Sequence, residues 1–188
     1  MKVLSTPLPD VKLVEPTVHA DNRGFFLETY QQHRYSHHHI GPHFVQDNLS
    51  WSKRGTLRGL HLQWPYPQGK LIYVLQGEVF DVAVDVRVGS PTFGQWAGER
   101  LSGENKHQLW IPQGFAHGFC VLSETALVAY KCTDLYHHET ELSLRWDDPV
   151  VNIDWPLAAP QLSPKDAQAP YLTDISESRL PRYEEVIP

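Results

Sequence analysis

The chain has 188 residues, of which 41% are hydrophobic and 20% are charged, and its formal net charge is -6. This length suits one ordinary domain with a full hydrophobic core. The excess of negative charge argues against bulk nucleic acid or an anionic membrane as a partner, but a few basic side chains suffice for a small anionic ligand. No apolar stretch approaches the length of a membrane span, and the start of the chain lacks a signal-peptide pattern. We therefore expect a single cytoplasmic domain over residues 1–188.

Two cysteines, Cys120 and Cys132, are too few for a disulfide scaffold. Both lie in apolar stretches typical of strands, so we expect two buried free thiols. The segment from His33 to His43, HRYSHHHIGPH, is rich in histidine, including the His37–His39 run. Consecutive side chains point in different directions and seldom complete a tetrahedral metal site, so this pattern predicts a solvated loop.

The middle of the chain is rich in predicted strands. Residues 71–88 contain two β-rich runs separated by Gln76 and Gly77, a break that predicts a hairpin. In the second run, apolar residues from Phe80 to Val86 alternate with Asp81, Ala83 and Asp85, which is the period of a strand. Further short strands are predicted by the segments HQLWIP, HGFCVL and ALVAYKC.

Turn signals recur at close spacing, and no long stretch shows the 3.6-residue period of a helix. This pattern predicts an all-β sandwich or barrel. After Trp155 the segment LSPKDAQAPYL predicts a short helix with Ser163 as N-cap and Pro164 at the first position. The last stretch, ESRLPRYEEVIP, is expected to be surface coil.

The residues from Gly55 to Gly77 resemble the first of the two motifs of cupins, which are small β-barrels that often bind a metal. Five residues separate Gly55 from His61, the first ligand position, and the second ligand position holds Gln63. Six residues, slightly more than the three or four that the motif allows, then lead to Lys70, where the motif has Glu. The second motif, Pro-x-Gly-x-x-His, is intact and ends at His117.

A lysine at the acidic position of this motif argues against a catalytic metal. A protonated ammonium has no lone pair and repels a divalent cation. The remaining polar groups, the imidazoles of His61 and His117 with the ammonium of Lys70, are expensive to bury in a barrel and therefore indicate a functional site. For His117 the residues leave two roles open, a hydrogen-bonded core histidine and a substrate-binding side chain.

Several further segments resemble the dTDP-4-dehydrorhamnose 3,5-epimerase family of sugar-nucleotide enzymes. These are RGLHLQ, QGKL, GEVFDVAVDVR, GSPTFG, LWIPQGFAHGF, YKCTDLY and RWDDP, which occur in order between about Asp21 and Asp166. The resemblance implies a cupin-type jelly-roll barrel, or double-stranded β-helix, with short C-terminal helical segments and with residues 155–188 packed on the barrel. It also implies a cofactor-independent isomerase that acts on a dTDP-4-keto-6-deoxyhexose, in dTDP-rhamnose biosynthesis.

Epimerisation next to a ketone needs a base, a group that stabilises the enolate and an acid on the opposite face. A neutral imidazole suits the base, so we assign it to His61. The resemblance implies that Asp166 holds the far nitrogen of His61, while a helix N-terminal charge remains an alternative role for that carboxylate. Lys70 suits the enolate, and the resemblance selects Tyr130 as the acid rather than as a core tyrosine bonded to backbone.

The resemblance also implies residues that bind the nucleotide. Basic side chains suit the diphosphate, and the correspondence selects Arg58, Arg23 and Lys165. Gln46 and Asn48 correspond to residues that hydrogen-bond the nucleotide. Glu28 corresponds to a thymine contact with Phe25 beside it, and Tyr136 to the aromatic residue that stacks on the base. Phe25 and Phe26 are also expected to be at least partly core.

The resemblance finally implies a homodimer that exchanges N-terminal strands, so that the segment around Arg23 reaches the site of the neighbouring subunit. Three alternatives stay open: an enzyme that inverts only carbon 3 or carbon 5, a non-catalytic cupin that binds sugar nucleotides, and a metal-dependent cupin oxygenase or isomerase. Lys70 argues against the last of these.

Overall fold

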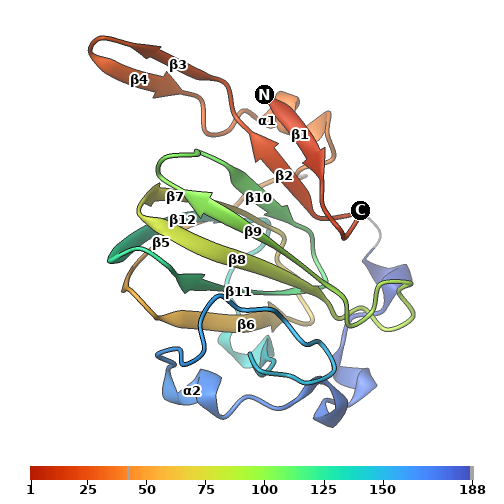
Figure 1. Ribbon diagram of the computed structural model, residues 1–188. Coiled ribbons are helices and arrows are strands. Elements are labelled where there is room, and N and C mark those ends of the chain that lie inside the picture. Colours follow the sequence, from red (N-terminus) through yellow and green to blue (C-terminus); the bar gives the residue numbers. More distant parts are fainter. Residues whose placement is uncertain (42, 187–188) are drawn as a thin grey trace.

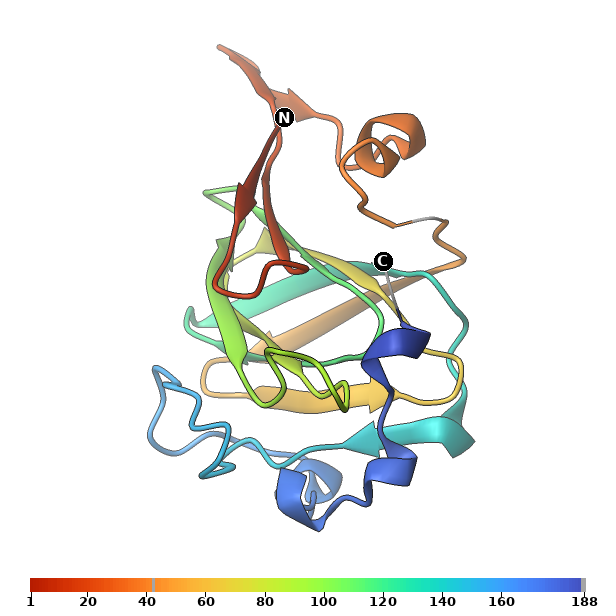
Figure 2. The same ribbon diagram turned by 90° about the vertical axis from the view of Figure 1, so that its right-hand side faces the viewer.

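The computed structural model describes residues 1–41 and 43–186, so Pro42, which lies within the histidine-rich segment, and the last two residues are outside the description. Two antiparallel sheets face each other as a flattened barrel (Figures 1 and 2). The first has six strands in the order β1 (Lys2–Ser5), β2 (Lys12–Glu15), β10 (Gln108–Ile111), β7 (Lys70–Gln76), β12 (Thr125–Cys132) and β5 (Gln46–Lys53). The second has five, in the order β13 (Glu141–Ser143), β6 (Leu57–Gln63), β11 (Phe115–Val121), β8 (Glu78–Asp85) and β9 (Trp96–Ser102). The all-β prediction is confirmed.

A separate two-stranded hairpin, β3 (Val18–Asp21) and β4 (Gly24–Leu27), projects away from the barrel (Figure 1). The α-helices are short: α1 (Gln32–Ser36) and α2 (Pro164–Ala167), with 3-10 turns η1 (His138–Thr140), η2 (Leu172–Asp174), η3 (Glu177–Arg179) and η4 (Tyr183–Glu185). Among the described residues, no helix has both the length and the apolar character that a membrane crossing requires.

The hairpin predicted at Gln76 and Gly77 is wrong, although the strand break is right. Strand β7 pairs with β10 and β12 in one sheet, whereas β8 pairs with β11 and β9 in the other. Both edges of β8 are therefore occupied, and β7 cannot pair with it. Gly77 carries the chain between the sheets with a φ of +82°, and a Cβ there would lie 2.0 Å from the Thr125 carbonyl oxygen.

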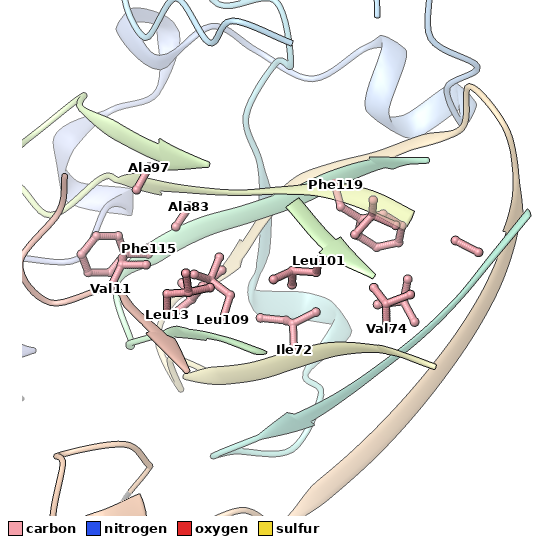
Figure 3. Close-up of a cluster of buried hydrophobic side chains, with 14 of the residues drawn as sticks. Val11, Leu13, Ile72, Val74, Ala83, Ala97, Leu101, Leu109, Phe115 and Phe119 are labelled. Atoms are coloured by element: carbon pink, nitrogen blue, oxygen red, sulfur yellow. The ribbon is translucent and has the colours of Figure 1, made fainter. Parts of the chain in front are cut away.

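The main hydrophobic core lies between the two sheets, and Figure 3 shows part of it. Side chains from both sheets contribute, among them Ile72 and Val74 of β7, Leu101 of β9 and Phe115 and Phe119 of β11. The polar positions of β8, Asp81 and Asp85, face inward as well, because they share a strand face with Val79 and Ala83, which belong to the main core. The predicted alternation of β8 is thus present.

The apolar positions of β8 face outward, where the C-terminal segment covers them. Val82 and Val84 pack in a second hydrophobic cluster with Leu172, Ile175 and Leu180 of the tail. The tail wraps below the five-stranded sheet in Figure 1. The last stretch is therefore not simple coil: its described part forms η3 and η4 and buries Leu180, which is 3% exposed.

Candidate active site

Two adjoining cavities of about 290 Å³ each open between the sheets at one end of the barrel, and both are lined by His61, Lys70 and Tyr130. The first is also lined by Gln46, Asn48, Leu62, Gln63, Gln68, Tyr136 and Glu141. The second is also lined by Ser50, Arg58, His117, Phe119, Ser163, Lys165 and Asp166. The structure thus brings together all four catalytic candidates and six of the nine binding candidates.

An irregularity in β6 lets two of these residues share one cavity. Arg58 and His61 are three positions apart, a spacing that puts side chains on opposite faces of a regular strand. The pairing of β6 with β11 shifts register here, because His117 pairs with His61 but Phe119 pairs with Arg58. This local bulge turns both side chains into the second cavity.

The two strands approach closely at the bulge, which requires glycine on both. A Cβ at Gly59, whose φ is +115°, would lie 2.6 Å from the His117 carbonyl oxygen, and a Cβ at Gly118 would lie 2.7 Å from the Arg58 carbonyl oxygen. Residues with side chains would push the strands apart.

His61 and Asp166 form a hydrogen-bonded pair, with 2.6 Å between Nε2 and the carboxylate Oδ1. Asp166 lies on α2, where Ser163 is the N-cap and Pro164 the first position, as predicted, and Ser163 Oγ accepts the Asp166 N–H at 3.1 Å. Burial of Asp166 would raise its pKa, but the hydrogen bonds from His61 and Ser163 outweigh it and hold the pKa of Asp166 below its ordinary value. The carboxylate is therefore ionised and can orient the imidazole.

Backbone bonds fix α2 against β6. Gln161 accepts the N–H of Leu57 at 3.0 Å and donates its own N–H to Gly55 at 2.7 Å. These bonds join the tail that carries Asp166 to the start of the strand that carries His61.

Lys70 is the first residue of β7 and is 8% exposed. Burial lowers the pKa of Lys70, while the neighbouring Cys132 thiol and the carboxylates of Glu141 and Asp81 act in the opposite direction. A buried cation at the wall of a cavity attracts negative charge that develops inside it.

Tyr130 lies on β12, on the strand face shared with Ala126 and Val128, as predicted. The pKa of Tyr130 is raised, mainly by burial, so the phenol keeps its proton at neutral pH. Tyr130 and Lys70 come from the six-stranded sheet, whereas His61 comes from the five-stranded one. The imidazole and the phenol therefore approach the cavities from opposing sheets.

His117 lines the second cavity and is also bonded in the core, so both of its anticipated environments are present. Its Nε2 lies 3.0 Å from Oδ1 of Asp81, and both residues are buried. Among the described residues no cluster of three or more His, Cys, Asp or Glu side chains could hold a metal ion. Cys120 and Cys132 are buried free thiols, which confirms that prediction.

The polar candidates at the mouth of the first cavity are linked to one another. Gln46 Nε2 donates to Asn48 Oδ1 at 3.1 Å, and Gln46 Oε1 accepts the N–H of Tyr136 at 3.0 Å. Tyr136 as a whole stays 51% exposed at the rim. In the second cavity, the Nε of Arg58 donates to Ser52 Oγ at 3.0 Å.

Glu141 is a cavity residue that the sequence did not reveal. It pairs with Gln63 in register, forms an ion pair with Lys165 and accepts the Tyr136 hydroxyl at 2.9 Å. Burial would raise the pKa of Glu141, but these bonds and nearby His61 hold it below its ordinary value. Its segment, HHETELS, carries no recognisable motif, so only the fold identifies it.

Three candidates, Arg23, Phe25 and Glu28, line neither cavity within one chain. The Arg23 side chain is 85% exposed on the projecting hairpin and pairs with Asp21. Glu28 pairs with Arg34 at 3.0 Å. Phe25 and Phe26 are 58% and 70% exposed, so the expectation that they are partly core is wrong. Both line a surface cavity beside Tyr73 of β7 and Gln108 of β10 instead of entering the core.

Comparison with known proteins agrees with this architecture. The model of the family described as dTDP-4-dehydrorhamnose 3,5-epimerase matches residues 5–174. A protein of that name from Pseudomonas aeruginosa is 57% identical over 176 residues, which cover 93% of this chain and 97% of the relative. One from Neisseria gonorrhoeae is 58% identical over 167 residues, which cover 88% of this chain, and the match spans about half, 51%, of that longer relative.

A solved structure extends the likeness to the fold. It is the crystal structure of the dTDP-6-deoxy-D-glucose-3,5-epimerase of Legionella pneumophila in complex with dTDP-4-keto-L-rhamnose, which superposes with a TM-score of 0.95 at 57% identity and covers 97% of this chain and 98% of that one. This match confirms the predicted cupin-type barrel. The chain belongs to the dTDP-4-dehydrorhamnose 3,5-epimerase family.

Proposed function

We propose that this chain inverts carbons 3 and 5 of dTDP-4-dehydro-6-deoxy-D-glucose and so forms dTDP-4-dehydro-L-rhamnose, with no cofactor. Membership of the family supports the substrate and the reaction. The observation that carries the mechanism is that His61 and Tyr130 line the same cavities from opposing sheets. A base and an acid on opposite sides of a sugar ring invert a stereocentre, whereas groups on one side would restore it.

In this mechanism His61 removes the proton on the carbon next to the 4-keto group. The pair with Asp166 supports this role, because an ionised carboxylate at 2.6 Å orients the imidazole and stabilises the imidazolium that forms. Asp166 itself keeps its charge, and His61 returns to the neutral form before the next exchange.

The enolate that results carries negative charge on the 4-oxygen, and Lys70 stabilises it. The ammonium lies in a buried wall where water does not screen the attraction, so its effect on the barrier is larger than that of a surface lysine. Tyr130 then donates its phenolic proton to the opposite face of the carbon. Its raised pKa keeps that proton available at neutral pH. Before the second centre reacts, solvent returns a proton to the tyrosinate and takes the proton held by His61.

The nucleotide part binds through the rim of the cavities. Arg58 and Lys165 supply positive charge for the diphosphate, and Gln46 and Asn48 supply hydrogen bonds. The half-exposed ring of Tyr136 offers a face on which the thymine can stack.

We propose further that the protein acts as a homodimer in which the β3–β4 hairpin of one subunit completes the site of its partner. The support is that Arg23, Phe25 and Glu28 line neither cavity of their own chain. Exposed Phe25 and Phe26 on a projecting hairpin form an apolar surface of the kind that a partner covers.

Deuterium exchange tests the reaction. In deuterated buffer with dTDP-4-dehydro-6-deoxy-D-glucose, proton NMR should show loss of signal at both carbon 3 and carbon 5. Exchange at one carbon would indicate a single-centre epimerase, and binding without exchange a non-catalytic binding protein. Loss of exchange in chelator, with stoichiometric metal in the pure protein, would indicate the metal-dependent alternative.

Subunit complementation tests the shared site. His61→Ala and Arg23→Ala variants are each expected to be inactive, and mixing them under conditions that exchange subunits should restore activity. A hybrid dimer has one site with both defects and one intact site, so roughly one site in four is intact after random exchange. No recovery, with hybrids demonstrated by mass, would place Arg23 in the site of its own chain.

A further inference from the structure

Gln63 occupies the second ligand position of the cupin motif, yet its side chain is committed elsewhere. The residue is 5% exposed at the end of β6. Its Nε2 donates to the carbonyl oxygens of Tyr66 and of Leu135, the latter at 3.0 Å, and its Oε1 accepts the N–H of His137 at 2.8 Å. Both donor hydrogens and the acceptor oxygen are thus used by backbone groups.

Two of these partners, Leu135 and His137, stand on either side of Tyr136. The N–H of Tyr136 itself is held by Gln46 Oε1 at 3.0 Å. The backbone is therefore hydrogen-bonded at three successive residues, while Tyr136 remains 51% exposed and lines the first cavity.

The third partner extends the link to the loop after β6. Tyr66 and His137 stack with ring centroids 4.6 Å apart and an interplanar angle of 28°, so the two loops that Gln63 joins also touch through their side chains. Only an amide supplies two donors and one acceptor in this shape. A carboxylate would face two carbonyl oxygens without a hydrogen to donate, and a hydrocarbon would leave three buried backbone groups unpaired.

We propose that Gln63 is a positioning residue that fixes the backbone around Tyr136 and so holds its ring ready to stack on the nucleotide base. This inference rests on the proposed function. Both amide hydrogens of Gln63 are bound by backbone carbonyl oxygens, and its partners belong to the rim rather than to His61, Lys70 or Tyr130. Its effect should therefore fall on nucleotide binding and not on the proton transfers.

The test is Gln63→Met, which keeps the length of the side chain and removes all three bonds. Isothermal titration with dTDP should show affinity weakened about tenfold, because an unfixed loop must be ordered on binding. Deuterium exchange at saturating substrate should stay within about threefold of the wild type, since interactions made equally before and during the reaction affect KM and not kcat.

Ser123→Ala is the matched control, because Ser123 also ties a loop to backbone groups but lies outside both cavities. Its hydroxyl oxygen accepts the N–H of Glu78 at 2.7 Å, and its hydroxyl hydrogen is donated to the carbonyl oxygen of Thr125 at 2.7 Å. This variant should lower thermal stability without changing dTDP affinity.

A double-mutant cycle then separates an effect on the position of Tyr136 from a general loss of stability. If Gln63 acts through Tyr136, Gln63→Met should weaken dTDP binding by less than about twofold in a Tyr136→Ala background.

Additive losses in this cycle, or a fall in kcat as large as the fall in affinity, would overturn the proposal. Gln63→Glu gives a second readout if the methionine variant does not fold. Its carboxyl can donate a hydrogen only when protonated, so dTDP affinity should recover partly toward pH 5 relative to pH 8, and an unchanged ratio to wild type across this range would also overturn it. Wild-type protein that binds no dTDP would instead refute the proposed function itself.

Discussion

Replacing Lys70 by methionine should slow the reaction and stabilise the fold, two effects of opposite sign. An ammonium about 4 Å from an enolate oxygen contributes about 4 kcal/mol at an effective dielectric constant of about 20. Removal of one such group from a buried site costs about 10²–10³ in rate. Lys70 is 8% exposed, so little water enters to replace it, and we expect the upper part of that range.

Stability should rise because the folded protein disfavours the charged lysine. Burial lowers the pKa of Lys70, which means that the ammonium costs folding free energy at pH 7. That cost is full below the lowered pKa and disappears as pH rises toward the unfolded value of about 10.4. The neighbouring carboxylates keep other partners, since Glu141 pairs with Lys165 and Asp81 with His117.

The assay is deuterium incorporation into dTDP-4-dehydro-6-deoxy-D-glucose by NMR, with urea unfolding at pH 7 and pH 10 on the same samples. Lys53→Met, a change of the same kind at an exposed position of β5, serves as control and should alter neither quantity by much. Exchange by Lys70→Met within about fivefold of the wild type would remove the ammonium from enolate stabilisation. A lower free energy of unfolding at pH 7 would refute the electrostatic reasoning.

Other consequences concern the histidine partner, a buried ion pair and the close strand approach. Asp166→Asn should lower kcat about 10²-fold or more while dTDP affinity, measured by calorimetry, stays within about twofold, because the amide keeps the contact and loses the charge that stabilises the imidazolium. Asp85→Asn should lower the free energy of unfolding by about 3 kcal/mol at pH 7, because the buried guanidinium of Arg87 loses a bidentate partner. The hydrogen bonds to Asp85 outweigh its burial and hold its pKa below the ordinary value, so this difference should be full above about pH 4 and shrink in urea titrations toward pH 3. Gly118→Ala should cost more than about 2 kcal/mol in the same assay and reduce activity, because its Cβ would meet the Arg58 carbonyl oxygen at 2.7 Å; wild-type stability would contradict the packing argument.

Local signals in the sequence were reliable where short-range chemistry decides the structure. The capping pattern at Ser163 and Pro164 predicted α2, and the period of two predicted β8, because both depend on neighbours within a few residues. The hairpin at Gly77 failed for the opposite reason. A break between strands looks the same in sequence whether the next strand pairs with the first or crosses to another sheet, and only the partners β9 and β11 decide it.

The residues of the candidate site also differ in whether local sequence or long-range contacts determine their position. The spacing from His61 to Lys70 largely survives as a motif, although it is slightly longer than usual, because both residues lie near the ends of consecutive strands. Asp166 lies 105 residues from His61, and only the family resemblance paired them. Glu141 has no such signal, since its role arises from pairing with β6 across the sheet.

The route of the tail has one more consequence. The same segment that shields the valines on the outside of β8 also delivers the carboxylate that His61 needs. Loss of residues beyond about 160 would therefore expose the apolar outer face of the five-stranded sheet and, at the same time, remove the carboxylate partner of His61. Natural shortening at this end should therefore be selected against for two reasons, stability and activity. A foreign C-terminus grafted onto the barrel would have to supply both an apolar covering for the sheet and a carboxylate within hydrogen-bonding distance of the histidine.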